Sequence, residues 1–140
     1  MSREANSFTT EELEKIDQLR KRVTKDLELR EDQVSDHYLI RWLRARSLNV
    51  SKAEEMLRKS LQWRKENGVD TILETAEIPE HLKKRMFFGY LGIDPVSELP
   101  VMLFLLGRFD IARDIEEVGA ESLFRCNIYF MEYIQKVIFK

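Results

Sequence analysis

Apolar residues recur at steps of three and four through the first seventy positions, a pattern that predicts amphipathic helices. In the first of these helices, Thr9 and Glu12 stand at the spacing of a capping box, in which each side chain bonds the backbone N–H of the other residue. The apolar stripe that follows consists of Leu13, Ile16, Leu19, Val23 and Leu27. Charged residues fill the other faces, so this helix is expected to pack through one narrow side.

Two further helices are predicted downstream. Ser35 is the expected N-cap of the first, which ends near Ser47, and Leu39, Trp42 and Leu43 share its inner face. Ser51 and Glu54 have the spacing of a second capping box, which would begin the next helix. Asn67 and Gly68 are expected to end that helix, because glycine readily adopts the left-handed conformation found at helix ends. Three helices with short connections predict a compact helical lobe over residues 8–68.

The second half of the chain has a different pattern. Pro79 fits the first position of a short helix that runs to about Phe88, where glycines interrupt it. Residues 99–106 are apolar at nearly every position, as in a strand covered on both faces. Residues 120–140 have a wide apolar face at helical spacing. A single strand cannot satisfy its own backbone, so it either pairs with a short segment near residues 89–92 or belongs to a domain that this chain leaves incomplete.

Composition and charge narrow the function classes. The 140 residues are 44 % hydrophobic and 34 % charged, enough for about one domain. A net charge of −2 argues against a nucleic-acid partner, which usually requires a basic face. The only cysteine, Cys126, excludes an internal disulfide, and no apolar run is long enough to cross a bilayer. We therefore expect a soluble, cytoplasmic protein.

Catalytic machinery is not visible in the sequence. The two histidines, His37 and His81, lie near predicted helix starts, where exposed positions are common, and no nucleophile elbow or phosphate-binding glycine loop occurs. One cysteine and two scattered histidines do not form a zinc site. We expect no enzyme activity, no cofactor and no metal.

Two basic segments remain as candidates for binding. Arginines alternate with an aromatic residue over residues 41–46, but helical spacing assigns Trp42 to the core and favours pairing of the arginines with acids such as Glu54 or Glu55 over contact with nucleic acid. Lys83, Lys84 and Arg85 precede Met-Phe-Phe, so this segment is either a solvated helix face or a transient contact with an anionic membrane surface.

The sequence resembles the CRAL-TRIO (Sec-fourteen-like) lipid-transfer family over about residues 8–140. The N-terminal signature is carried by YLIRWLRARSL at 38–48, followed by Ala53, Met56, Leu57, Trp63 and Arg64. The opening of the family's lipid-binding lobe is matched by Gly92, Asp94, Pro100, Val101, Gly107, Arg108 and Asp110. Within the family, the chain looks most like the animal branch of supernatant protein factor and the tocopherol-associated proteins. The turn between Asp94 and Pro100 departs from the family pattern. It is one residue longer and has Ser97 and Glu98 where a glycine is usual.

The resemblance implies a mainly α chain: the N-terminal three-helix lobe, then the first strand and helix of an incomplete α/β lipid-binding domain over residues 78–140. It implies a carrier that binds and transfers a hydrophobic lipid, such as a phospholipid, a phosphoinositide, tocopherol or a squalene-like molecule. The lipid-lining candidates are Met102, Phe104, Leu106, Phe124, Ile128 and Met131. The family's lipid lobe continues for about a hundred residues beyond this point, so the chain is expected to be truncated and its lipid binding impaired. The alternatives are a helical protein-interaction module, with self-association through the unpaired strand, and a non-functional fragment.

Overall fold

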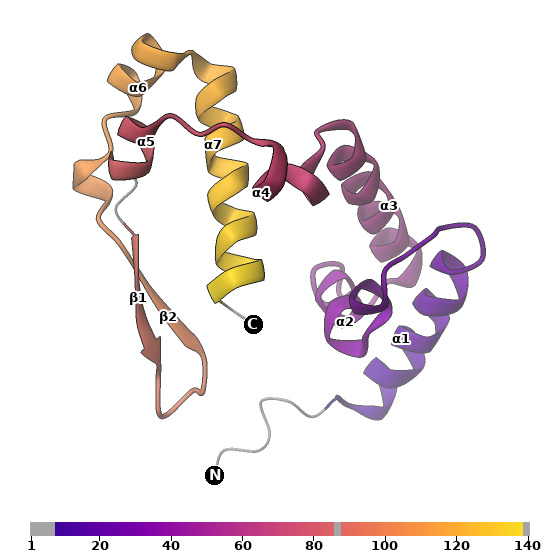
Figure 1. The fold of residues 1–140 in the computed structure, drawn as a ribbon. Helices are drawn as coiled ribbons and strands as arrows, with labels where there is room; N and C mark the ends of the chain where they lie inside the picture. The colour runs from indigo at the N-terminus through magenta and orange to yellow at the C-terminus, as the bar shows by residue number, and fades with distance from the viewer. Residues whose placement is uncertain (1–7, 86–87, 139–140) are drawn as a thin grey trace. The chain divides into compact units, whose positions relative to one another are not determined.

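The computed structural model describes residues 8–85 and 88–138 and is mainly helical, with one small antiparallel sheet (Figure 1). This confirms the predicted fold class. The described residues up to Lys65 form one compact unit, and those from Glu66 onwards form a second.

Three α-helices and one short 3-10 turn make the first unit. They are α1 (Thr10–Val23), η1 (Glu31–Val34), α2 (Asp36–Arg44) and α3 (Val50–Glu66). Their apolar stripes meet in one core, in which the buried side chains are Ile16, Leu19, Val23, Leu39, Ile40, Leu43, Val50, Ala53 and Leu57. Trp42 packs against this core, as its helical position predicts, and its ring lies 5.9 Å from that of Tyr38.

Local side-chain bonds explain where α1 and α2 begin. The Thr9 hydroxyl oxygen accepts from the Glu12 backbone N–H at 3.1 Å, and the Glu12 carboxylate accepts from that of Thr9 at 3.0 Å, so the predicted capping box is confirmed. The Ser35 hydroxyl oxygen accepts from the backbone N–H of Tyr38, which confirms Ser35 as the cap of α2.

The second predicted capping box is wrong. Helix α3 begins at Val50, ahead of Ser51, and the side-chain oxygen of Asn49 accepts the backbone N–H of Lys52 at 3.0 Å. Asn49 therefore caps this helix. The expected stop is correct, because Gly68 adopts a left-handed conformation (φ 59°) directly after the helix.

Ser51 and Glu54 are instead engaged by arginines. Arg22 on α1 donates to the Ser51 hydroxyl oxygen at 3.0 Å and to the Glu54 carboxylate at 3.3 Å. Glu54 also accepts from Arg58, and Arg58 in turn donates to both carboxylate oxygens of Asp26. These four charges, which we call the α1–α3 ion chain, run in the order Arg22, Glu54, Arg58, Asp26 and hold α3 against the end of α1.

The second unit combines short helices with a hairpin. Its helical segments are η2 (Val69–Thr71), α4 (Ile72–Thr75), α5 (Glu80–Arg85), η3 (Leu106–Arg108), α6 (Ile111–Val118), α7 (Ala120–Tyr133) and the π-helical η4 (Ile134–Ile138). Ile78, Leu82 and Cys126 form its buried cluster. The short helix after Pro79 ends at Arg85, earlier than predicted, because Phe88 already belongs to a strand.

The strand partner is the upstream segment considered from the sequence. Strand β1 (Phe88–Ile93) pairs antiparallel with β2 (Pro100–Phe104), with Tyr90 opposite Met102. A bulge between Tyr90 and Gly92 shifts the register. The strand is shorter than the predicted 99–106.

The turn of this hairpin accommodates its unusual residues. The Asp94 carboxylate accepts from the backbone N–H of Ser97 at 2.7 Å and from its hydroxyl group at 2.5 Å. These bonds lower the pKa of Asp94. Glu98 takes φ 57°, a conformation that usually needs glycine. The turn therefore closes through side-chain bonds, at the cost of a strained Glu98.

Candidate lipid-binding surface

Helix α7 has two apolar faces with different surroundings. On the inner face, Cys126 is fully buried against Ile78 and Leu82. Phe124, Ile128 and Met131 are spaced four and three residues apart, so they share another face of the helix. Phe124 is 52 % exposed and Met131 is 54 % exposed, whereas Ile128 is half-buried. We call these three residues the α7 stripe.

The α7 stripe is the set of lipid-lining candidates that the structure brings together. A continuous apolar stripe left open to water is unfavourable, since burial of apolar surface is worth about 25 cal/mol per Å². Such stripes on folded proteins mark surfaces that bind an apolar partner or ligand.

The hairpin candidates are divided by the structure. Met102 and Phe104 lie two residues apart on β2 and share one face of the hairpin, with Met102 half-buried and Phe104 45 % exposed. Leu106 does not share it, because it lies beyond the strand in η3, where it is 75 % exposed. A strand over residues 99–106, as predicted, would place Leu106 on the same face as Met102 and Phe104, so the prediction is wrong for this residue.

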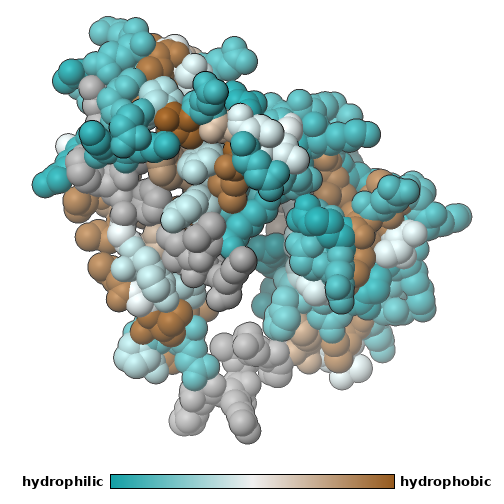
Figure 2. Space-filling model, in the orientation of Figure 1, coloured by the Kyte–Doolittle hydropathy of each residue, from teal (hydrophilic) through white to brown (hydrophobic). Residues whose placement is uncertain are grey.

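The prediction that β2 is covered on both faces is also wrong for the part of the chain that the structure describes. Val101 and Leu103 on the second face of β2 are exposed, as are Tyr90, Leu91 and Ile93 on β1. Figure 2 shows brown, hydrophobic residues at the surface over the hairpin. Both faces of this small sheet are open to an apolar ligand or to further secondary structure.

Helix α6 adds exposed apolar residues that the sequence analysis missed. Ile111 and Ile115, four residues apart, are exposed on this helix. Two residues in the sequence could have indicated this helix. Asp110 is its N-cap, with a side chain that accepts from the Arg113 backbone N–H, and Gly119 follows its last residue.

The candidate membrane-surface residues lie on α5. Lys83 and Lys84 are exposed, and Lys83 lies 3.8 Å from the Glu80 carboxylate. Arg85 ends the helix, but its side chain, like residues 86–87, falls outside the described part of the structure. The two lysines therefore present positive charge to solvent, partly offset by Glu80.

The arginine-rich segment of the first unit makes structural contacts, but among the described residues it forms no direct ion pair with Glu54 or Glu55, contrary to the prediction. Arg44 donates to Glu12 at 2.7 Å, and Arg46 acts on Glu55 through its charge alone. Glu55 pairs with Lys59, which lowers its pKa.

The cysteine and the histidine of the second unit have different surroundings. Burial, with the charge of Asp114, raises the pKa of Cys126 to about 11, so its thiol stays protonated. His81 is half-exposed and lies 3.6 Å from Glu117. Over residues 8–85 and 88–138, the structure has no group of three or more His, Cys, Asp or Glu side chains placed to hold a metal ion. In the same ranges, no helix combines the length and apolar character needed to cross a membrane.

Comparison with known proteins identifies the first unit. Residues 15–59 match the family model for the CRAL/TRIO N-terminal domain. The chain therefore carries the N-terminal domain of the CRAL-TRIO family, which confirms the family seen in its sequence. The animal branch within that family stays a prediction.

Individual relatives match over more of the chain. It is 32 % identical to the Protein real-time of Aedes aegypti over 119 residues, which is 84 % of this chain and 18 % of that protein. It is 31 % identical to the phosphatidylinositol/phosphatidylcholine transfer protein SFH4 of Arabidopsis thaliana over 130 residues, 91 % of this chain and 21 % of that protein. It is 32 % identical to SFH9, of the same description and species, over 98 residues, 69 % of this chain and 17 % of that protein. The matched region thus spans about a fifth of these relatives.

Proposed function

We propose that this chain takes part in the binding and intermembrane transfer of a hydrophobic lipid, as a carrier and not an enzyme. Residues 8–68 form the helical lobe, and residues 78–140 supply the opening hairpin and helices of the lipid-binding domain. The ligand is a phospholipid, a phosphoinositide, tocopherol or a squalene-like molecule. Two of the relatives described above are phosphatidylinositol/phosphatidylcholine transfer proteins, which supports the phospholipid class.

The observation that carries this proposal is the α7 stripe. Its side chains are apolar, and two of them, Phe124 and Met131, are exposed, although the same helix buries Cys126 on another face. A lipid tail requires an apolar wall with few polar groups, and methionine adapts to irregular chains. Met102 and Phe104 on the hairpin extend the apolar surface available in this unit.

The 140-residue chain is expected to hold lipid weakly. Binding sites for small apolar ligands bury most of the ligand surface, whereas Phe124 and Met131 are each more than half exposed. An acyl chain on such an open surface would keep much of its own area in water. We therefore expect an occupied but rapidly exchanging complex.

Photo-crosslinking tests the proposal. The purified chain is incubated with phosphatidylcholine vesicles that contain a phosphatidylcholine with a photoreactive group in its tail, irradiated, and digested for mass spectrometry. Adducts are expected within α7 at residues 124–131. The double variant Phe124→Ser, Met131→Ser should lose them, while Leu13→Ser, which removes an exposed leucine from α1, should not.

Two results would contradict this reading. If the double variant were labelled as strongly as the unaltered chain, the α7 stripe would not be part of the lipid-binding site. A saturable one-to-one lipid complex seen by native mass spectrometry would show that the chain holds lipid more tightly than we propose.

Self-association is the second candidate, and the hairpin favours it. In the two-stranded sheet, each strand pairs on one side only, and β2 carries no charged residue. Edges of this kind, without charged residues to block them, pair with other strands. A monodisperse dimer in light scattering would favour an interaction module, and a monomer that crosslinks lipid would favour the carrier.

A further inference from the structure

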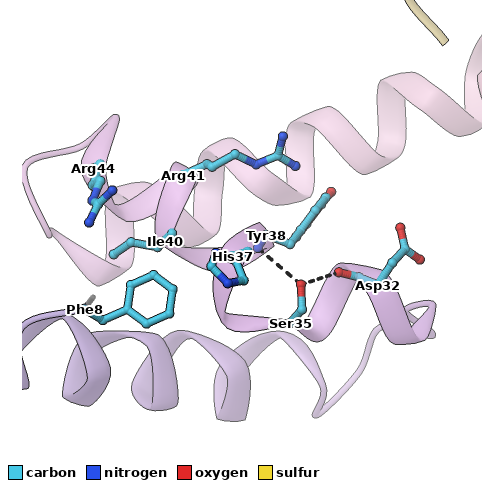
Figure 3. Close-up of a pocket in the computed structure, with 8 residues that line it drawn as sticks. All are labelled: Phe8, Asp32, Ser35, His37, Tyr38, Ile40, Arg41 and Arg44. Atoms are coloured by element: carbon cyan, nitrogen blue, oxygen red, sulfur yellow. Dashed lines mark hydrogen bonds between the residues drawn. The ribbon is translucent and has the colours of Figure 1, made fainter. Parts of the chain in front are cut away.

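A pocket on the first unit has no role in the carrier function proposed above. It is an open pocket beside α2, has a volume of about 490 Å³, and is lined by Phe8, Asp32, Ser35, His37, Tyr38, Ile40, Arg41 and Arg44 (Figure 3). Its lining combines aromatic and aliphatic surface with hydroxyl groups, an imidazole, one carboxylate and two guanidinium groups. This mixture differs from the α7 stripe, which is apolar throughout.

Two of the charges at this pocket are neutralised within the protein. The Asp32 carboxylate accepts from Arg30 through both oxygens, at 3.0 and 3.2 Å. The Arg44 guanidinium donates to Glu12 at 2.7 Å. Neither group therefore contributes a full uncompensated charge to a ligand.

Arg41 is different. Its guanidinium lies 5.1 Å from the centre of the Tyr38 ring, and no carboxylate in the described part of the chain pairs with it. Stacking on an aromatic ring orients a guanidinium and leaves its N–H groups available to an acceptor. The pocket thus has an uncompensated positive charge, held in place by Tyr38.

The Tyr38 side chain supplies a hydroxyl group to the same region. Burial raises the pKa of Tyr38, while the positive charges of Arg64, Arg41 and Arg30 oppose that shift. The hydroxyl group therefore stays protonated at neutral pH and can donate a hydrogen bond. Figure 3 shows Tyr38 and Arg41 extending from α2 in the same direction.

We propose that this pocket binds a phosphate monoester, with the Arg41 guanidinium and the Tyr38 hydroxyl group as its donors. Guanidinium groups form paired hydrogen bonds with phosphate oxygens, and a neutral hydroxyl group adds a third donor. The same chemistry is presented by a lipid headgroup such as phosphatidic acid and by a soluble phosphate ester. The site is in a different unit from the α7 stripe, so it can exist whether or not that stripe binds lipid.

The experiment measures binding with two sources of the same group. The chain labelled with ¹⁵N is titrated with glycerol 3-phosphate while the signals of the Arg41 side chain and the Tyr38 backbone are followed. In a second arm, sedimentation with phosphatidylcholine vesicles is compared in the presence and absence of phosphatidic acid. Shifts with glycerol 3-phosphate indicate a soluble ligand, and binding only to phosphatidic acid vesicles indicates a headgroup.

Matched variants separate a site from general charge attraction. Arg41→Gln is expected to weaken binding about fivefold, since a charge-assisted hydrogen bond at an exposed position is lost. Arg46→Gln makes the same change of charge just beyond α2, where Arg46 is exposed and donates only to the neighbouring Ala45 carbonyl, and it should leave binding unchanged. Tyr38→Phe keeps the ring and removes only the hydroxyl group, so it should weaken binding with the fold intact.

The proposal is overturned if neither arm detects binding, or if Arg46→Gln weakens it as much as Arg41→Gln. The proposal is supported if Arg41→Gln and Tyr38→Phe lower the affinity while their backbone spectra otherwise stay unchanged.

Discussion

The carboxylate of Glu12 joins α1 to the end of α2 through its bond with Arg44. Its Oε1 atom accepts from the Arg44 Nε at 2.7 Å, and its Oε2 atom accepts from the backbone N–H of Thr9 at 3.0 Å. One side chain therefore completes the cap of a helix and anchors a neighbouring helix. The cap was predictable from the spacing of Thr9 and Glu12, but the anchor was not.

Replacing Glu12 by Gln should lower the thermal midpoint of the first unit. The amide can still accept from Thr9, but the ion pair with Arg44 is lost. Circular dichroism melts at neutral pH measure the loss. Glu11→Gln, which removes an exposed charge from the same first turn, is the control and should have a smaller effect.

The effect of Glu12→Gln should depend on pH. The bonds from Arg44 and then Thr9 lower the pKa of Glu12, so its charged form stabilises the fold above the ordinary carboxyl pKa. This contribution is lost as the pH falls through the lowered pKa. The difference in midpoint between the native chain and the variant should therefore be full at neutral pH and shrink below about pH 4. A difference that stays constant down to strongly acidic pH would contradict the role of the charge.

Asn49 should be more important to α3 than Ser51. Because the Asn49 side chain caps this helix, Asn49→Ala should cost about 1 kcal/mol of unfolding free energy. Ser51→Ala removes only an exposed bond from Arg22 and should cost less. Urea unfolding measures the free energy of unfolding of both variants. A larger loss for Ser51→Ala than for Asn49→Ala would favour the capping box of Ser51 and Glu54 predicted from the sequence.

The hairpin turn should be stabilised by Glu98→Gly. Glu98 adopts φ 57°, which strains an L-residue, whereas glycine adopts it freely. The gain is expected to be a few tenths to about 1 kcal/mol, since glycine also loses more backbone entropy on folding. Amide hydrogen exchange in β1 and β2 reports the change. Glu98→Ala is the control because it removes the charge but keeps the strained Cβ; an equal gain there would point to charge and not to backbone strain.

Cys126 should react slowly in the folded chain. It is fully buried, and its pKa is raised to about 11 from the ordinary 9.0 of an exposed thiol. At mildly alkaline pH the thiolate fraction is therefore lower by about a hundredfold, before access is considered. Alkylation by iodoacetamide should be rapid in denaturant and slow in buffer. Equal rates would show that Ile78 and Leu82 do not cover this side chain in solution.

The sequence predicted features set by neighbours in the chain. The Thr9 and Glu12 box, the Ser35 cap and the Gly68 stop all depend on residues within one helical turn, so spacing was sufficient. The family was also recognisable, because its signature is concentrated in residues 38–48.

Features set by distant residues were not predictable in this way. Ser51 and Glu54 have capping spacing, yet Arg22 and Arg58 engage them across the core. The partner of Arg44 lies 32 positions away on α1. For the candidate site, helical spacing was sufficient to place the α7 stripe on one face. The end of β2 depends instead on its pairing with β1, so the position of Leu106 beyond the strand was not predictable.

The α1–α3 ion chain has a consequence for which substitutions the first unit can tolerate. Arg22 and Asp26 are its two ends, so losing either one breaks a single link and leaves each of the three remaining residues with an oppositely charged partner. Glu54 and Arg58 are interior members, and losing either one breaks two links and strands an end. Substitutions should therefore be tolerated more readily at the two ends of the α1–α3 ion chain, Arg22 and Asp26, than at Glu54 and Arg58 in its middle.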